Sequence, residues 1–243
     1  MKLTFIGTSH GVPEAHRRCS CCILESGGSR YIIDMGTQVI GDLRRMEIDV
    51  ASVRLAACTH PHGDHTSGLF SFADLVNWYF KDAKPKILLS DAGLTALLRT
   101  WITVSNNGKQ PREGLRIETY AGGLIYADEN LRLTAIPTQH CANSYALLAE
   151  ADGKKVLFTG DLRHPSVDFP AVAFETELDL IVCELAHFSP DDCVPVFDRT
   201  KAKRVLHNHI NDGRWREALD RQLAQPHPYQ YGEARDGLTL TIA

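Results

Sequence analysis

The densest group of metal-ligand side chains in the chain reads His60-Pro61-His62-Gly63-Asp64-His65. It follows a strand-like run, residues 53–58, and loops at the ends of strands are where rigid scaffolds commonly present chemistry. In an extended segment residues i and i+2 point the same way, so the first two histidines are able to bind one ion together. The glycine lets the backbone turn, which aims the aspartate and the third histidine at a second point nearby. This spacing predicts a site for two cations, in preference to a polar loop that only caps a helix.

The pattern HxHxDH resembles the signature of the metallo-β-lactamase superfamily, whose members fold as a four-layered αββα sandwich around one or two metal ions. The family pattern continues with a His, an Asp and a last His, each placed after a strand. Those positions are met by His140 after residues 131–136, Asp161 after 155–158 and His209 after 203–206. The resemblance therefore spans nearly the whole chain and implies an α/β fold of the four-layered αββα type.

The resemblance also implies two ligand sets that share one carboxylate. One ion is held by His60, His62 and His140, the other by Asp64, His65 and His209, and Asp161 bridges the two. A carboxylate suits the bridge because it places two oxygens and a negative charge between two cations. Two Zn²⁺ ions are expected from this imidazole-rich set, and Mn²⁺ stays open because it also accepts His and carboxylate ligands. Such ions lower the pKa of a nearby water molecule and stabilise charge that develops on phosphorus.

His207 is a second candidate for the last ligand, because it lies two residues before His209 on the same face of the expected strand. The family pattern is a basic pair, a hydrophobic run and then the ligand, which fits Lys203-Arg204 followed by His209. We therefore expect His207 to support a ligand or to pack in the interior.

The segment after the expected strand 178–183 carries two candidate catalytic residues, Glu184 and His187. The chain resembles the ribonuclease Z branch of the superfamily here and at residues 34–38, although the usual Gly-Glu of that branch is reduced to Met35. In that branch a Glu and a His ahead of the last ligand protonate the leaving group, a task that suits a side chain with an ordinary pKa of about 6.5. The predicted catalytic residues are Asp64, Glu184 and His187. The alternative is that His187 only caps the helix expected after residues 189–192.

The length of the chain between two ligands bears on the substrate. Enzymes of this branch that process tRNA 3′ ends carry a long Gly/Pro-rich arm between the ligands equivalent to His140 and Asp161. Here residues 141–160 leave room for a hairpin over residues 151–153 and nothing more. The net charge of −4 also disfavours tRNA, because its binding relies on basic surface that neutralises phosphates. We expect a small phosphodiester substrate and no stable nucleic-acid complex.

A further resemblance narrows the substrate class. Residues 7–14, 17–20 and 33–37 are similar to the anti-Pycsar family, metallo-β-lactamase-fold nucleases of phages and bacteria that hydrolyse 3′,5′-cyclic nucleotides as homodimers. The resemblance implies a cyclic-nucleotide phosphodiesterase and a homodimer. The Gly/Pro-punctuated loop 7–14 is the expected place for substrate contacts, with His10 and Glu14 as candidates.

Three other functions stay open at this point. They are a ribonuclease Z-like tRNA 3′ endonuclease, another small-phosphodiester hydrolase, and a protein that uses its metals only for structure or sensing. The last is disfavoured because structural zinc sites are commonly closed cages of four ligands. The preferred base, the native metal and the physiological role are not indicated by the sequence.

Length and composition indicate the kind of domain that carries these sites. With 243 residues, 44% of them hydrophobic, the chain is long enough to bury a core, and we expect one hydrolase domain over residues 1–243. No apolar run approaches the roughly 20 residues of a membrane span, and the start does not resemble a signal peptide. Seven cysteines without scaffold spacing favour a cytoplasmic setting. Cys19, Cys21 and Cys22 are expected to pack in the core, because C-x-C-C is unusual spacing for a further zinc site.

The remaining elements follow from periodicity and turn signals. Strands are expected at 2–7, 20–25, 30–34, 53–58, 86–90, 131–136, 144–150, 154–158, 178–183 and 238–242, with helices after 38, through 80, at 92–104 and at 214–223. Residues 106–114 are the most loop-like stretch, a candidate lid or dimer contact. Trp78, Tyr79 and Phe80 are expected in the core or at a subunit interface, in preference to a platform that stacks on a ligand.

Overall fold

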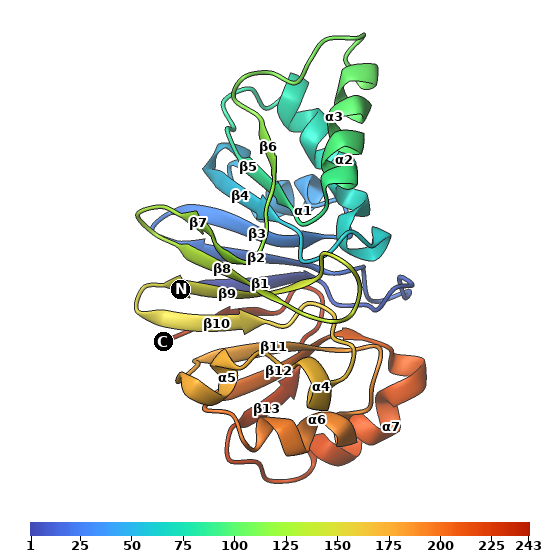
Figure 1. The fold of residues 1–243 in the computed structure, drawn as a ribbon, viewed down its shortest axis with the longest axis vertical. Coiled ribbons are helices and arrows are strands. Elements are labelled where there is room, and N and C mark those ends of the chain that lie inside the picture. Colours follow the sequence, from blue (N-terminus) through green and yellow to red (C-terminus); the bar gives the residue numbers. More distant parts are fainter.

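Two seven-stranded β-sheets form the centre of the molecule in the computed structural model, which describes residues 1–243 (Figure 1). The first sheet has the order β14-β1-β2-β3-β4-β5-β6 and the second β13-β12-β11-β10-β9-β8-β7. The strands of the first sheet are β1 (Lys2–Gly7), β2 (Cys21–Ser26), β3 (Ser29–Met35), β4 (Val53–Ala57), β5 (Lys86–Leu89), β6 (Arg116–Thr119) and β14 (Thr239–Thr241). Those of the second are β7 (Gly123–Ala127), β8 (Arg132–Pro137), β9 (Tyr145–Ala151), β10 (Lys154–Phe158), β11 (Leu180–Leu185), β12 (Arg204–Ile210) and β13 (Gln230–Glu233).

Helices cover the outer side of each sheet, which gives four layers. The first sheet carries α1 (Ile40–Arg45), α2 (Gly63–Trp78) and α3 (Ala92–Ser105), seen at the top of Figure 1. The second sheet carries α4 (Pro165–Asp168), α5 (Val172–Glu175), α6 (Pro190–Phe197) and α7 (Asp212–Leu223). One buried cluster joins the two sheets, with Phe5 and Tyr31 from the first and Leu147 from the second. The predicted αββα arrangement is confirmed.

Most of the expected elements form, and those that sequence patterning did not indicate are short. The strands β6, β7 and β13 have four or five residues each, and most side chains of β6 and β7 are exposed or partly exposed. Without a buried face, a strand has no alternation of apolar and polar residues to reveal it. The helices α4 and α5 are single turns of four residues. The segment 106–114 has neither helix nor strand, as expected.

Parallel pairing within each sheet brings the functional segments to one edge. The strands β3, β4 and β5 run parallel in the first sheet, and β10, β11 and β12 in the second. The carboxyl ends of parallel strands meet at the same edge of a sheet. The metal loop follows β4, Asp161 follows β10, Glu184 lies near the end of β11 and His209 near the end of β12.

The N-terminal loop, residues 8–20, is held against the C-terminal part of the chain by a buried arginine. Arg17 is 3% exposed and donates hydrogen bonds to Thr8 Oγ1, the Ala234 carbonyl and Asp212 Oδ2 at 2.7–2.8 Å. A buried guanidinium is stabilised only when paired and hydrogen-bonded, as it is here. The loop is therefore fixed beside the edge of the sheets where the functional segments meet.

The cysteines of the C-x-C-C run pack in the core, as predicted. Cys21 lies in the cluster between the first sheet and its helices, whereas Cys22 lies in the cluster between the two sheets. Adjacent side chains on a strand point to opposite faces, so these two thiols cannot converge on one ion. No helix of the structure combines the length and the apolar character that crossing a membrane requires.

Candidate metal centre

The histidine-rich segment passes directly from β4 into α2. His62 takes the N-cap position with extended backbone, and the helix begins at Gly63. Close packing fixes the helix here, because a Cβ on Gly68 would lie 1.9 Å from the Thr37 carbonyl oxygen. The segment 36–37 thus rests against the first turns of α2, and only glycine allows this approach.

Three imidazoles converge at the mouth of the site. His60 Nε2 lies 3.1 Å from His62 Nδ1, which in turn lies 3.2 Å from His140 Nε2. The three rings come from the loop after β4, the cap of α2 and the loop between β8 and β9. Three imidazole nitrogens within 4.8 Å of one another are a donor set expected around a divalent ion. The structure brings together the first predicted ligand set.

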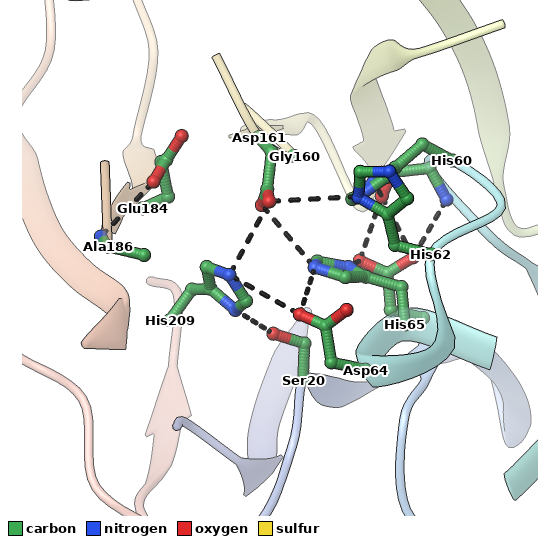
Figure 2. Close-up of polar contacts among 12 residues, drawn as sticks. Ser20, His60, His62, Asp64, His65, Gly160, Asp161, Glu184, Ala186 and His209 are labelled. Atoms are coloured by element: carbon green, nitrogen blue, oxygen red, sulfur yellow. Dashed lines mark hydrogen bonds and ion pairs between the residues drawn. The ribbon is translucent and has the colours of Figure 1, made fainter. Parts of the chain in front are cut away.

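The second predicted set lies deeper. Asp64 Oδ2 is 3.4 Å from His65 Nε2 and 3.6 Å from His209 Nε2. Asp161 stands between the two sets, as Figure 2 shows, with Oδ2 3.7 Å from His60 Nε2 and 3.4 Å from His209 Nε2. Its other oxygen, Oδ1, is 3.4 Å from His65 Nε2. One carboxylate thus faces nitrogens of both sets, which is the geometry of a bridging ligand.

Two atoms in this cluster are buried without a hydrogen-bond partner of suitable geometry, His65 Nε2 and Asp161 Oδ1. A buried polar atom left unmet costs stability, so these two atoms fit the presence of cations. The pKa shifts in the cluster run in both directions. Burial and the neighbouring His65 lower the pKa of His60 to about 2, whereas Asp34 and Asp161 raise the pKa of His65 although burial opposes this. His209 and His65 hold the pKa of Asp161 well below its usual range, again against the effect of burial. Neutral imidazole and ionised carboxylate are the forms that bind metal, and His60 and Asp161 have these forms without an ion.

A layer of hydrogen bonds orients the ligand rings. His65 Nδ1 lies 2.8 Å from Asp34 Oδ2, and His209 Nδ1 lies 2.8 Å from Ser20 Oγ. Asp34 also accepts from the Thr59 N–H at 2.7 Å, which ties the end of β3 to the metal loop. Partners of this kind fix the tautomer of a ligating histidine. Neither Asp34 nor Ser20 is among the site residues predicted from the sequence. The signals for Asp34 are its place at the end of a strand, directly ahead of Met35-Gly36, and the resemblance of residues 34–38 to the ribonuclease Z branch.

Asp34→Asn is expected to weaken metal binding by roughly 10- to 100-fold, the usual effect of losing the partner of a ligand. The substitution keeps the size of the side chain, and asparagine accepts the backbone that Asp34 has, with φ at 57°. It removes the charge that orients His65. Competition against a chromophoric chelator measures the affinity. Asp128→Asn is the matched control, since Asp128 accepts from Tyr31 and Tyr126 and is not among the residues of the ligand cluster. Equal losses in both variants would contradict the assignment.

Glu184 and His187 form a second, adjoining unit. His187 Nδ1 donates to Glu184 Oε2 at 2.7 Å, and the Leu162 N–H donates to Glu184 Oε1 at 2.7 Å. The hydrogen bond with Glu184 raises the pKa of His187 to about 9, against the effect of burial. His187 is 40% exposed and its Nδ1 lies 3.9 Å from Asp161 Oδ2. A protonated, partly exposed imidazole beside the ligands is suited to donate a proton.

The structure decides two questions that the sequence leaves open, the cap of α6 and the face on which His207 lies. Ser189, with Asp192, caps α6, so the alternative that His187 caps this helix is wrong. His207 does not share a face with His209: it is fully buried on the helix-covered side of the second sheet, whereas His209 points into the ligand cluster. The expectation of a shared face is corrected, because His209 is the extra residue of a bulge between β11 and β12 and has φ at 53°.

An open cleft of about 610 Å³ adjoins the ligand cluster on the side of Asp64. Its walls are mostly small or polar residues, including Gly11 and Pro13 of the N-terminal loop and Thr37. The predicted substrate contacts His10 and Glu14 lie in the same loop but pair with each other, Nε2 to Oε1 at 3.3 Å. Their contact with substrate stays a prediction. The volume falls in the range that small-molecule ligands occupy.

The family profile described as Anti-Pycsar protein Apyc1 matches residues 1–192, most of the chain. The chain belongs to this anti-Pycsar family. The predicted resemblance is therefore confirmed, and the matched region contains every ligand-cluster residue except His209. His209 lies beyond the residues that the anti-Pycsar profile matches, and its Nε2 lies 3.4 Å from Asp161 Oδ2.

Curated relatives of this anti-Pycsar family member are named ribonuclease Z. The one from Anoxybacillus flavithermus is 29% identical over 167 residues, covering 67% of this chain and 53% of the relative. The one from Methanocaldococcus jannaschii is 26% identical over 149 residues, 61% of this chain and 47% of the relative. The chain thus spans about half the length of these curated relatives.

Solved structures similar to this anti-Pycsar family member share its architecture. The metallo-β-lactamase fold protein YhfI from Bacillus subtilis has a TM-score of 0.78 at 16% identity, covering 98% of both chains. The short form of human tRNase Z has a TM-score of 0.75 at 18% identity, covering 100% of both chains. At these identities the likeness concerns the fold, which is the metallo-β-lactamase fold.

Proposed function

We propose that the chain is a metal-dependent phosphodiesterase that opens 3′,5′-cyclic nucleotides to nucleoside monophosphates, with residues 1–243 acting as one hydrolase domain. The observation that carries the proposal is Asp161, whose two carboxylate oxygens face the nitrogens of both ligand sets. Membership of the anti-Pycsar family supports the substrate class. The cytoplasmic setting expected from the cysteines is part of the same proposal.

The ligand roles follow the geometry. His60, His62 and His140 would hold one ion, Asp64, His65 and His209 the other, and Asp161 both. Two divalent cations, zinc in our proposal, would supply an activated water and neutralise the charge of the phosphate. Asp64 would take part in the reaction as a metal ligand. The proton that the leaving group takes up would come from another side chain of the protein.

His187 is the proposed proton donor. Its Nδ1–H is held by Glu184, which leaves Nε2 to carry the proton that the leaving ribose oxygen takes up as its bond to phosphorus breaks. Glu184 also accepts from the backbone of Leu162 and Ala186, so its own position is fixed by β11 and the loop after β10. The acid is thereby set at the same edge of the sheets as the ligands.

The cleft beside Asp64 is the proposed place for the nucleoside. A volume of about 610 Å³ accommodates a ribose and a purine or pyrimidine base. The lining combines four glycines, which contribute only backbone, with polar side chains that include Arg18, Gln38 and Ser67. We expect tolerance of the base, because most of the binding would be directed at the phosphate and the reacting centre.

A homodimer completes the proposal. Trp78 and Tyr79 at the end of α2 are 51% and 60% exposed, so the expectation that they lie in the core of this chain is wrong and the interface alternative remains. On α3, Trp101 and Val104 are 50% and 73% exposed. Exposed aromatic residues gathered on neighbouring helices are typical of interfaces.

Trp101→Glu is expected to convert the dimer to a monomer, because it places a charge in an interface that excludes water. Sedimentation velocity measures the change. Val167→Glu is the control, since Val167 is 53% exposed on α4, on the other side of the molecule. A wild-type protein that sediments as a monomer would contradict the dimer.

The substrate is tested by incubating the metal-loaded protein with cyclic AMP, GMP, CMP and UMP and with precursor tRNA, and by separating the products. We expect all four cyclic nucleotides to be opened and the tRNA to stay intact. Between His140 and Asp161 the chain forms only the hairpin of β9 and β10, which offers no extended arm to hold tRNA. Cleavage of the tRNA with the cyclic nucleotides untouched would favour the ribonuclease Z activity for which the curated relatives are named.

A further inference from the structure

Three side chains of metal-ligand type meet between the second sheet and its covering helices, apart from the metal centre. Cys183 of β11, Cys193 of α6 and His207 of β12 are each fully buried, and their donor atoms lie within 4.8 Å of one another. Cys183 and His207 are paired in register on neighbouring strands. Both cysteines belong to the core between the second sheet and its helices. We call these three residues the thiol cluster.

The hydrogen bonding of His207 points to a missing partner. Its Nε2 lies 2.6 Å from the Tyr231 hydroxyl oxygen, whereas its Nδ1 is buried without any hydrogen-bond partner. An unmet polar atom in a protein interior is costly. In metal sites, a ligating histidine commonly gives one ring N–H to a fixed partner and binds the ion through the other nitrogen. His207 has this arrangement, with Tyr231 as the fixed partner.

The dimensions of the thiol cluster suit a cation. Three atoms no more than 4.8 Å apart all lie within about 2.8 Å of some common point, close to the zinc–sulfur distance of about 2.3 Å and the zinc–nitrogen distance of about 2.0 Å. A contraction of at most about 0.5 Å for each sulfur and about 0.8 Å for the nitrogen would complete the contacts. Two thiolates with one neutral imidazole also balance the charge of a dication, so the bound site would be neutral where it is buried.

We propose that Cys183, Cys193 and His207 bind a thiophilic d¹⁰ cation, zinc in the first instance, at a buried site separate from the metal centre. The chain supplies three ligands there, one fewer than the common four-ligand structural zinc cage. Thiolate and imidazole ligands select such ions over hard cations. On binding, the two thiols each release a proton to solvent and their sulfur lone pairs form the bonds to the ion.

The position of the site gives the ion a structural role. Cys183 directly precedes Glu184, and His207 lies two residues before His209. Cys193 lies on α6, the helix that begins just after His187. An ion at the thiol cluster would thus join β11, β12 and α6, the elements that hold the proposed proton donor and the last ligand of the metal centre.

Cobalt substitution tests the proposal with a signal that the metal centre does not give. Cobalt bound by thiolate has a strong charge-transfer absorption in the near ultraviolet, and the proposed ligands of the metal centre are only imidazoles and carboxylates. We expect this absorption in the wild-type protein after reconstitution with Co²⁺, and its loss in Cys183→Ser and Cys193→Ser. Cys141→Ser is the matched control, because Cys141 is the partly buried thiol next to His140. The absorption should persist in that variant.

Metal analysis of the wild-type protein tests the same point without relying on variants that could fail to fold. After growth with zinc and removal of loosely bound metal, we expect about three zinc ions per wild-type chain, two at the metal centre and one at the thiol cluster. The absence of a thiolate absorption in folded wild-type protein would overturn the proposal. So would loss of that absorption in Cys141→Ser alone, or a Cys183–Cys193 disulfide in freshly purified protein. Because the absorption reports only thiolate ligands, a failure of the two-metal centre would be seen separately.

Discussion

Asp161→Ala is expected to remove nearly all turnover, a loss on the order of 10³-fold or more, and to lower the metal content of the centre. The carboxylate of Asp161 lies 3.4–3.7 Å from ring nitrogens of His60, His65 and His209, so no other side chain can take its place between the two ligand sets. Its loss removes the carboxylate that faces ring nitrogens of both ligand sets, and leaves Asp64 beside the second set only. Elemental analysis and the rate of cyclic-nucleotide hydrolysis measure the two effects.

The control for this prediction is Cys21→Ala, a substitution at another fully buried residue that belongs to the core of the first sheet. It should keep both the metal and most of the activity. Circular dichroism of both variants establishes that they fold. An Asp161→Ala protein that retained most of its activity would show that a different residue bridges the ions.

His187→Ala is expected to keep its metal and to lose on the order of 10²–10⁴ in kcat on cyclic nucleotides, the usual contribution of a general acid. The loss should depend on the leaving group. The ribose oxygen of a cyclic nucleotide needs protonation as it departs, whereas a nitrophenolate is stable as an anion. Hydrolysis of bis-p-nitrophenyl phosphate should therefore be spared relative to the nucleotide.

His164→Ala is the matched control for His187, because the two side chains are 39% and 40% exposed and His164 lies three residues after Asp161 in the chain. His164 accepts from the backbone N–H of Ser166 at the start of α4 and has no bond to Glu184, so its loss should change kcat little. If His187→Ala slowed both substrates equally, the residue would position the substrate instead of donating the proton.

Much of the site was predictable from the sequence because its ligands are local to strand ends. The spacing of His60, His62, Asp64 and His65 is a motif in itself, and the family pattern supplied His140, Asp161 and His209 from the strands that precede them. Parallel pairing of the strands then brings these residues together, since strand ends that lie far apart in sequence meet at one edge of a parallel sheet. The four-layered fold followed from the same pattern.

The partners that orient the ligands depended on the tertiary structure. Asp34 reaches His65 and Ser20 reaches His209 across sequence separations of 31 and 189 residues. No periodicity or spacing encodes such a pair, because it depends on the register of strands and the packing of α2 against residues 36–37. The exposure of Trp78 and Tyr79 likewise depended on where α2 ends relative to its neighbours.

The sequence alone does not determine whether His207 or His209 faces the proposed metal centre. Strand alternation places His207 and His209 on one face, and by that rule either could bind the ion. In the structure a bulge inserts His209 between the residues that pair with Glu184 and Leu185, and its φ of 53° turns its side chain into the metal centre. His207 stays on the opposite face with Cys183 and Cys193. A bulge is set by the pairing of both strands. One strand's sequence therefore determines which residues are candidates, and the sheet determines which of them faces the proposed metal centre.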